Sequence, residues 1–170
     1  MIRLEPFERN DFKQLMAWID SPEFMVIWGG KTFSYPLTEQ QLETYICSNA
    51  LIYKVVNEDN NEVIGHINLT LDPSNHSGRI GKVIVGKRNL QGLGIGQLMV
   101  QKVLDIAFGQ LKLHRVSLGV FDFNHAAIAC YEKAGFVKEG LLREARKVDN
   151  EFWNLWEMGI LQKEWLNSQT

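Results

Sequence analysis

Three glycines with single residues between them, Gly92, Gly94 and Gly96, separate a strand-like segment from a helix-like segment. Residues 79–85 are rich in β-branched side chains, and residues 95–111 place apolar side chains at helical spacing. Glycine permits positive φ, and the first amide N–H groups of a helix have no partner within it. Those amides and the positive end of the helix dipole suit phosphate oxygens. The turn therefore predicts an α/β chain with either a phosphate-binding loop or a tight structural turn.

The residues around this turn do not fit two other nucleotide-binding motifs. A P-loop requires Lys-Ser or Lys-Thr after its last glycine, whereas Gln97 and Leu98 follow here. A Rossmann fingerprint places two residues between its last glycines, whereas only Ile95 separates Gly94 from Gly96. Both of these classes are therefore disfavoured.

The composition is that of a chain able to bury a core. Its 170 residues are 45% hydrophobic with a formal charge of -2, so one domain spanning residues 1–170 is expected. Balanced charges give no basic surface for nucleic acid. The start lacks the apolar run of a signal peptide and no segment could span a bilayer, so we expect a cytoplasmic protein without nucleic-acid or membrane partners. Cys47 and Cys130 lie far apart, which predicts free thiols and no metal site.

Hydrophobic periodicity predicts a mixed α/β (α+β) fold with a mostly antiparallel sheet. Asn10 or Asp11 is the expected N-cap of the first helix, and Thr38 with Gln41 forms a capping-box pattern for the second. Residues 21–36, with two prolines and two glycines, are expected to form an aromatic-rich loop. The expected elements are strands at 2–7, 51–56, 63–71, 79–85, 114–121, 136–148 and 152–161, and helices at 12–19, after 38, at 95–111 and at 125–135.

A second motif follows the glycine turn after one helix and one strand. The two motifs read Gln91-x-x-Gly94-x-Gly96 and Asn124-x-x-Ala127-x-x-x-Tyr131-x-x-x-Gly135-Phe136. In this order they resemble the GCN5-related N-acetyltransferase superfamily. The resemblance covers essentially the whole chain and is closest to the branch of ribosomal-protein N-terminal acetyltransferases and spermidine acetyltransferases. It implies a curved sheet of six to seven strands flanked by about four helices.

The resemblance also implies a reaction. Acetyl would pass from acetyl-CoA to a primary amine, either a protein N-terminus or a small amine, by direct attack in a ternary complex without a metal. Strand 79–85 would diverge from strand 114–121 and leave a slot for the thioester, with an amide near Val85 as oxyanion donor. Tyr131 would be the general acid that protonates the leaving sulfur. Relatives commonly form homodimers, so a homodimer is allowed.

The cofactor site implied by the resemblance has two halves. Asn124 would cap its helix and contact the cofactor arm, and Gln91 would shape the loop. Backbone amides at the helix start would hold the pyrophosphate, and the end of the preceding strand would hydrogen-bond the pantetheine arm. These two backbone segments are Gly92, Leu93, Gly94, Ile95, Gly96 and Gln97, and Val83, Ile84 and Val85.

Strand 79–85 departs from the superfamily in one respect. Many relatives carry a glutamate there as a base acting through water, whereas this strand has no carboxylate. The residues that could substitute share only a titratable side chain, and no spacing singles one out, so no base is nominated. They are Glu23, His66, Asp72, His76 and Asp122.

Alternatives remain open for single residues and for the whole chain. Tyr131 could anchor its helix on the sheet, and Asn124 could serve only as a cap. Cys130 is interpreted as a core residue and not as a nucleophile. The aromatic residues Phe24, Trp28, Phe33, Tyr35, Trp153 and Trp156 could wall the acceptor site or belong to the core. For the chain as a whole, the alternative function is a non-catalytic CoA-binding regulatory module.

Overall fold

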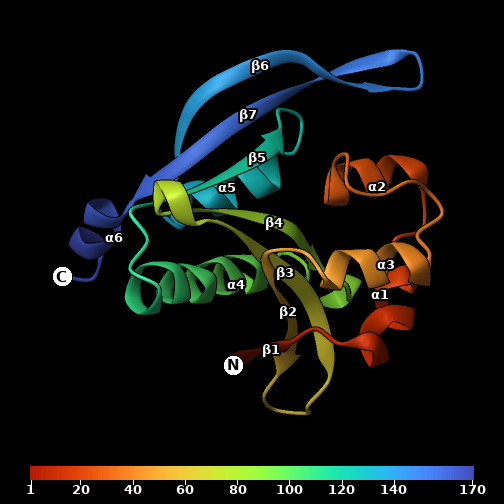
Figure 1. The fold of residues 1–170 in the computed structure, drawn as a ribbon, viewed down its shortest axis with the longest axis horizontal. Helices are drawn as coiled ribbons and strands as arrows, with labels where there is room; N and C mark the ends of the chain where they lie inside the picture. The colour runs from red at the N-terminus through yellow and green to blue at the C-terminus, as the bar shows by residue number, and fades with distance from the viewer.

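All seven strands lie in one sheet in the computed structural model, which describes residues 1–170. The strand order is β1-β2-β3-β4-β5-β7-β6, and only the pairing of β4 with β5 is parallel (Figure 1). The predicted mixed, mostly antiparallel sheet is confirmed. The strands are β1 (Ile2–Pro6), β2 (Ala50–Asn57), β3 (Val63–Asp72), β4 (Ser77–Val85), β5 (Arg115–Phe121), β6 (Val137–Val148) and β7 (Glu151–Leu161).

Helices cover both faces of the sheet and enclose two apolar cores. The larger core lies under α4 and α5 and includes Met99 and Ile128, and the smaller lies under α1, α2 and α3. On β4, Val83 and Val85 pack against the larger core and Ile84 belongs to the smaller one, because successive side chains of a strand point to opposite faces. The helices are α1 (Phe12–Trp18), α2 (Pro22–Gly29), α3 (Glu39–Ile46), α4 (Ile95–Leu104), α5 (His125–Lys133) and α6 (Gln162–Ser168).

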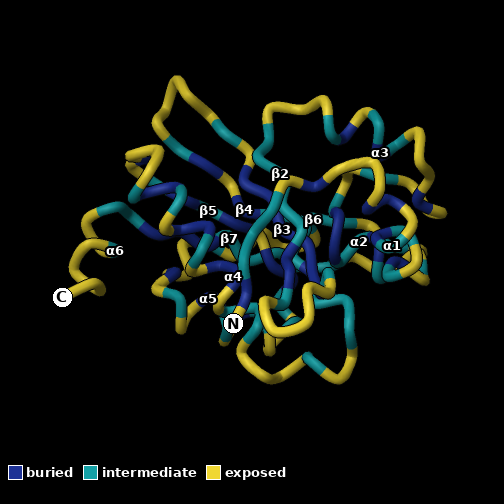
Figure 2. The backbone as a smooth tube through the Cα atoms, turned by 90° about the horizontal axis from the view of Figure 1, so that it is seen from below, coloured by how far each residue is buried: buried dark blue, intermediate teal, exposed yellow.

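Burial follows this layering. Figure 2 shows buried backbone along the central strands and exposed backbone at the loops and at the C-terminal helix.

No helix of the chain is both long enough and apolar enough to cross a membrane. No three His, Cys, Asp or Glu side chains are grouped so that they could hold a metal ion.

The prediction of a loop over residues 21–36 is wrong for its first half, which forms α2. The Ser21 hydroxyl accepts a hydrogen bond from the Phe24 N–H at 3.1 Å, and Pro22 occupies the first turn. Apart from Glu23, the residues of this short helix have no polar side chain. Its sequence therefore lacks the polar face by which an amphipathic helix is recognised. With α6, which the sequence pattern did not indicate either, six α-helices accompany the sheet instead of about four.

The expected helix caps hold in part. Asn124 caps α5 through its side-chain oxygen, and the Thr38 hydroxyl accepts from the Gln41 N–H at 3.3 Å. The Gln41 side chain binds the preceding loop, so the capping box is only half formed. Asp11 does not cap α1: its carboxylate accepts from the Glu8 N–H at 2.8 Å and closes a 3-10 turn before the helix.

A change of neighbours along β4 opens the sheet. β4 pairs with β5 only over residues 77–79, opposite residues 115–117, and beyond this point the two strands diverge. Its other edge continues to pair with β3, with a register shift at a bulge where Lys82 has φ +53°. From residue 80 to residue 85, the edge of β4 that faces β5 therefore has no strand partner.

Candidate active site

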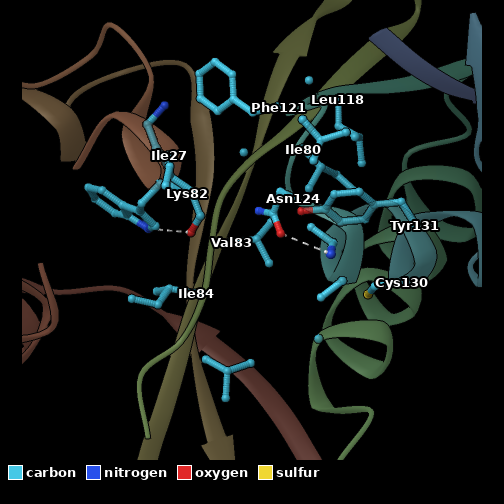
Figure 3. A pocket seen from close by; sticks show the side chains of 18 of the residues that line it. Ile27, Ile80, Lys82, Val83, Ile84, Leu118, Phe121, Asn124, Cys130 and Tyr131 are labelled. Carbon is cyan, nitrogen blue, oxygen red and sulfur yellow. Dashed lines mark hydrogen bonds between the residues drawn. The ribbon is translucent and has the colours of Figure 1, made fainter. Parts of the chain in front are cut away.

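A cleft of about 770 Å³ lies where β4 and β5 diverge. Its walls come from β4, β5, the start of α4, α5, the end of α2 and the β6–β7 hairpin. Figure 3 shows Lys82 and Ile27 on one side of β4 and Asn124 and Tyr131 on the other. The cleft therefore has two halves that meet at β4. The first half lies against α4 and α5, and the second half lies against α2.

The glycine turn forms the end of the first half. Gly92 and Gly94 have φ of +79° and +81°, and a Cβ atom at either position would meet no other atom within 4 Å. The first hydrogen bond of α4 runs from the Leu98 N–H to the Gly94 carbonyl at 3.1 Å, so the preceding amides are free of intrahelical partners. The Gln91 side chain donates to the Val85 carbonyl at 3.2 Å and ties the turn to the end of β4. The amide N–H groups at the start of α4 are therefore open to an anion.

The other residues named from the sequence for the cofactor line the same cleft with one exception, although the Ile84 side chain faces the smaller core. Val83, Ile84 and Val85 occupy the part of β4 whose edge is unpaired. Asn124 lines the cleft while its Oδ1 accepts from the Ala127 N–H at 3.3 Å. Of the complete set, only Leu93 does not line the cleft, and this residue is 67% exposed.

Tyr131 projects from α5 into the space beside β4 (Figure 3). The residue is buried, and its ring packs edge-on against Phe136 with a centroid separation of 6.2 Å. Burial raises the pKa of the Tyr131 phenol above its usual value, so the hydroxyl keeps its proton at neutral pH. The phenol is both a packed aromatic and an available proton donor.

Cys130 lies next to Tyr131 and also lines the cleft. Its Sγ would be 3.6 Å from a Cβ placed on Gly96, so it packs against the start of α4. Burial raises the pKa of this thiol, which disfavours the thiolate that a nucleophile requires.

None of the five candidate bases lines the cleft. Asp72 accepts hydrogen bonds from Ser74 and Asn75 in the turn between β3 and β4, where His76 also lies. Asp122 accepts from Asn154 at 2.9 Å. The remaining two, Glu23 on α2 and His66 on β3, also lie outside the cleft lining.

His66 belongs to a buried polar cluster behind the cleft. The Tyr45 hydroxyl lies 2.9 Å from both His66 Nε2 and Asn68 Nδ2, and the His66 ring meets Phe7 edge-on at 4.6 Å. Burial, with a smaller contribution from the charge of Lys82, lowers the pKa of His66 to about 3. His66 is therefore a neutral structural residue at neutral pH.

The aromatic residues divide between wall and core. Phe24 and Trp28 line the second half of the cleft, and the Trp28 indole donates to the Lys82 carbonyl at 3.0 Å. Phe33 stacks on Trp28 with a centroid separation of 5.3 Å and does not line the cleft.

The other aromatic candidates also lie outside the cleft lining. Tyr35 is exposed. Trp153 packs against Phe121 and Phe123, and Lys138 lies over the ring of Trp156.

Several lining residues carry no signal in the sequence. Arg79 and Lys82 on β4 and Arg146 on β6 line the cleft with basic side chains, of which Arg79 is paired with Glu157. Lys82 reaches the cleft because of the β4 bulge, and Arg146 because of an irregularity in β6. Neither irregularity leaves a periodic pattern, so sequence reasoning could not have found these residues.

A loop with open amides at a helix start, an unpaired strand edge and a buried phenol together fit the class of CoA-dependent acyltransferases. Residues 13–136 match the Acetyltransferase (GNAT) family. The chain belongs to this family and is an acetyl-CoA-dependent N-acetyltransferase. Nothing in the comparisons with known proteins supports a non-catalytic module.

The most similar proteins include spermidine acetyltransferases. The chain is 28% identical to spermidine N(1)-acetyltransferase of Vibrio cholerae over 167 residues, which are 98% of this chain and 96% of that protein. Identity to spermidine N(1)-acetyltransferase of Escherichia coli (strain K12) is 25% over 166 residues, 97% of this chain and 88% of that protein. The crystal structure of the Vibrio cholerae enzyme in complex with CoA and spermine superposes with a TM-score of 0.84 at 26% identity, covering 98% of both chains.

Proposed function

We propose that the cleft transfers acetyl from acetyl-CoA directly to a small primary amine, with both substrates bound together. The observation that carries this proposal is the divergence of β4 from β5, with free helix amides at one end and Tyr131 beside the gap. Acetyl-CoA would occupy the half against α4 and α5, and the amine would enter from the half against α2. A direct reaction needs no covalent enzyme intermediate, in line with a Cys130 that remains a thiol.

Backbone groups would hold acetyl-CoA in this proposal. The amides of residues 92–97 would bind the pyrophosphate, because two glycines with positive φ leave them open to the solvent. The unpaired edge of β4 over residues 83–85 would bind the pantetheine arm as an added strand does. Gln91 and Asn124 would contribute by fixing the turn and the start of α5.

In the chemical step, the amine nitrogen attacks the thioester carbon and the carbon–sulfur bond breaks. A β4 amide near Val85 would stabilise the oxyanion that forms. The Tyr131 hydroxyl would then give its proton to the departing sulfur. Burial raises the pKa of this phenol, so the hydroxyl is in its protonated form when the sulfur leaves. The attacking nitrogen loses one proton to solvent and Tyr131 regains one from solvent, so the products are the N-acetyl amide and the CoA thiol.

The amine must be neutral to attack, and the charges around the cleft favour that form. No Asp or Glu lines the cleft, whereas Lys31, Arg79, Lys82, Lys133 and Arg146 do. Neighbouring positive charges lower the pKa of an ammonium group, as burial and Arg79 already do for the pKa of Lys82. An incoming ammonium would therefore lose its proton to water without a dedicated carboxylate base.

A homodimer is a further proposal. β6 is the outermost strand of the sheet, and its Leu141 and Leu142 side chains are exposed. An exposed strand edge with apolar side chains is a template for pairing, here with a second copy of the chain. Sedimentation velocity at micromolar concentration tests this, and a purely monomeric protein would contradict it. The single domain over residues 1–170 and the cytoplasmic location also stay predictions.

Release of free CoA thiol from acetyl-CoA, measured across a panel of small amines and one peptide N-terminus, tests the proposed function. We expect thiol release that depends on the amine, with a product heavier by one acetyl group. Reactions without amine and without protein are the controls. CoA binding without turnover on every amine would instead favour a regulatory module.

A further inference from the structure

We propose that the amine acceptor is a small molecule that also carries a carboxylate and an apolar body, and that Arg146 binds the carboxylate. This inference rests on the proposed function and specifies its substrate class. Arg146 lines the second half of the cleft, against α2, although it comes from the distant β6–β7 hairpin. This half, where the amine would enter, is called the acceptor half.

The backbone of β6 places Arg146 there. The pairing of β6 with β7 shifts between Leu142 and Arg146, and Glu144 within this bulge has φ +51°. The Glu144 N–H donates to the Asn154 side chain at 2.8 Å, which anchors the bulge to β7. Bulges re-aim the side chains that follow them. Arg146 therefore faces the end of α2, where a Cβ on Gly30 would lie 3.9 Å from its Nη2.

The guanidinium of Arg146 lacks partners in the protein. Its Nε and Nη1 atoms are shielded from solvent and neither makes a hydrogen bond. Arg146 also forms no ion pair, unlike Arg79, which binds Glu157 through two hydrogen bonds of 2.8 and 2.9 Å. Arginine stays protonated in proteins, so it cannot relieve this by losing its charge. A guanidinium that lines a cleft and has no acceptor in the protein points to a ligand that supplies one.

A carboxylate matches what Arg146 offers. The planar guanidinium presents parallel N–H groups that fit the two oxygens of a carboxylate, and such charge-assisted pairs are among the stronger hydrogen bonds. The charge of the cleft agrees with this choice, because no Asp or Glu lines it and Lys31 and Lys82 also form no ion pair. A polyamine would bring further positive charges into this surrounding, whereas an amine with its own carboxylate would not.

The remaining wall of the acceptor half is apolar. Ile27 and Trp28 come from α2, and Leu155 comes from β7. These side chains would cover a hydrocarbon body between the amine and the carboxylate. An apolar amino acid has all three features, whereas spermidine, the substrate named for the relatives from Vibrio cholerae and Escherichia coli, has no carboxylate.

Matched pairs of acceptors that differ in the carboxylate test the inference in the thiol-release assay. The pairs are leucine with 3-methylbutylamine, phenylalanine with 2-phenylethylamine, and lysine with cadaverine, and spermidine is assayed beside them. We expect kcat/KM to be about 10- to 100-fold higher for the carboxylate member of at least one pair. Leucinamide separates the free carboxylate from a peptide-like N-terminus. Decarboxylated amines, spermidine or leucinamide reacting as well as the best amino acid would overturn the inference.

Variants assign the effect to Arg146. Arg146→Gln should lower kcat/KM for the preferred amino acid about 10- to 100-fold, mainly through KM, and change its decarboxylated partner less than threefold. Arg146→Lys should restore part of the loss because it keeps the charge without the planar fork. Arg143→Gln, an exposed position on the same strand outside the cleft, is the matched control.

Calorimetry with CoA separates a folding defect from a loss of recognition, and we expect CoA to bind Arg146→Gln as it binds the unaltered protein. Equal losses for both members of a pair would overturn the role of Arg146. Thiol release from no amine at all would contradict the proposed function itself, whereas release without preference for a carboxylate contradicts only this inference.

Discussion

Tyr131 lies in the structure where its sequence motif predicts, at the same cleft as Asn124. Its motif with Asn124 spans two turns of α5, and local helical geometry is enough to put both residues at the same cleft. Arg146 and Lys82 are the opposite case. Each reaches the cleft through an irregular strand pairing, and the bulges depend on partners on β7 and β3 that are distant in sequence. The sequence could therefore predict which residues line the half of the cleft against α4 and α5, but not the charges of the half against α2.

Tyr131→Phe separates proton donation from packing. It removes the hydroxyl and keeps the ring against Phe136, so we expect kcat to fall about 10²- to 10⁴-fold while the Kd of CoA changes less than twofold. Steady-state kinetics and calorimetry measure the two quantities. Tyr53→Phe on β2, outside the cleft, is the matched control. Parallel losses of turnover and CoA affinity in Tyr131→Phe would indicate a packing role.

His66 predicts a pH dependence of stability. Its pKa is about 3 in the folded chain, because of burial, and is near 6.5 when unperturbed. Between these values the unfolded chain binds the additional proton, so stability falls as the pH falls below about 6.5. From pH 6 to pH 5 we expect a loss of about 1 kcal/mol in the free energy of unfolding from this residue. Urea denaturation of the unaltered chain and of His66→Gln measures it.

The exposed His125→Gln variant is the control for this measurement and should keep the full slope. His66→Gln should flatten the pH dependence between pH 6 and pH 5. An unchanged slope in His66→Gln would mean that other groups carry the titration.

At the scale of helices and strands, hydrophobic periodicity identifies the elements that have one solvent-exposed face. Elements without such a face need other signals. β5 alternates apolar and polar residues and α4 has apolar residues at helical spacing, and the structure places both as expected. β3 is buried on both faces over residues 64–69, and the turn that precedes it at residues 57–62 marks it as a strand instead. α2 is apolar apart from Glu23, and its cap Ser21 and the following Pro22 are its local signs of a helix start. α6 packs its Trp165 against Phe108, a contact between segments far apart in sequence.

The contact of β3 with β4 and α4 depends on Gly65. A Cβ at this position would lie 2.7 Å from the Ile84 carbonyl oxygen and 3.3 Å from the sulfur of Met99. We therefore expect Gly65→Ala to lower the free energy of unfolding by about 1–3 kcal/mol through overpacking. Gly140→Ala on β6 is the matched control, since no atom lies within 4 Å of its Cβ position. Comparable denaturation midpoints for the two variants would show that β3 tolerates the methyl group.

Local sequence patterns predict most of the fold of the whole molecule. They predict the cleft only in the half against α4 and α5. Strand order, the divergence of β4 from β5 and the glycine turn agree with the resemblance to acetyltransferases. The distribution of charge could not be predicted, because it depends on which lysines and arginines the bent strands bring together. In the proposed function, the two halves of the cleft would therefore bind their substrates differently, with backbone atoms for CoA and side chains for the amine.

Calorimetric titration of CoA and of pantetheine into the same protein tests the central claim, that free amides at the start of α4 bind the pyrophosphate. Pantetheine keeps the arm that would lie along β4 but has no phosphate groups. We predict that CoA binds at least about 100-fold more tightly, as expected when two or more charge-assisted hydrogen bonds are lost. Pantetheine binding as tightly as CoA would contradict the claim.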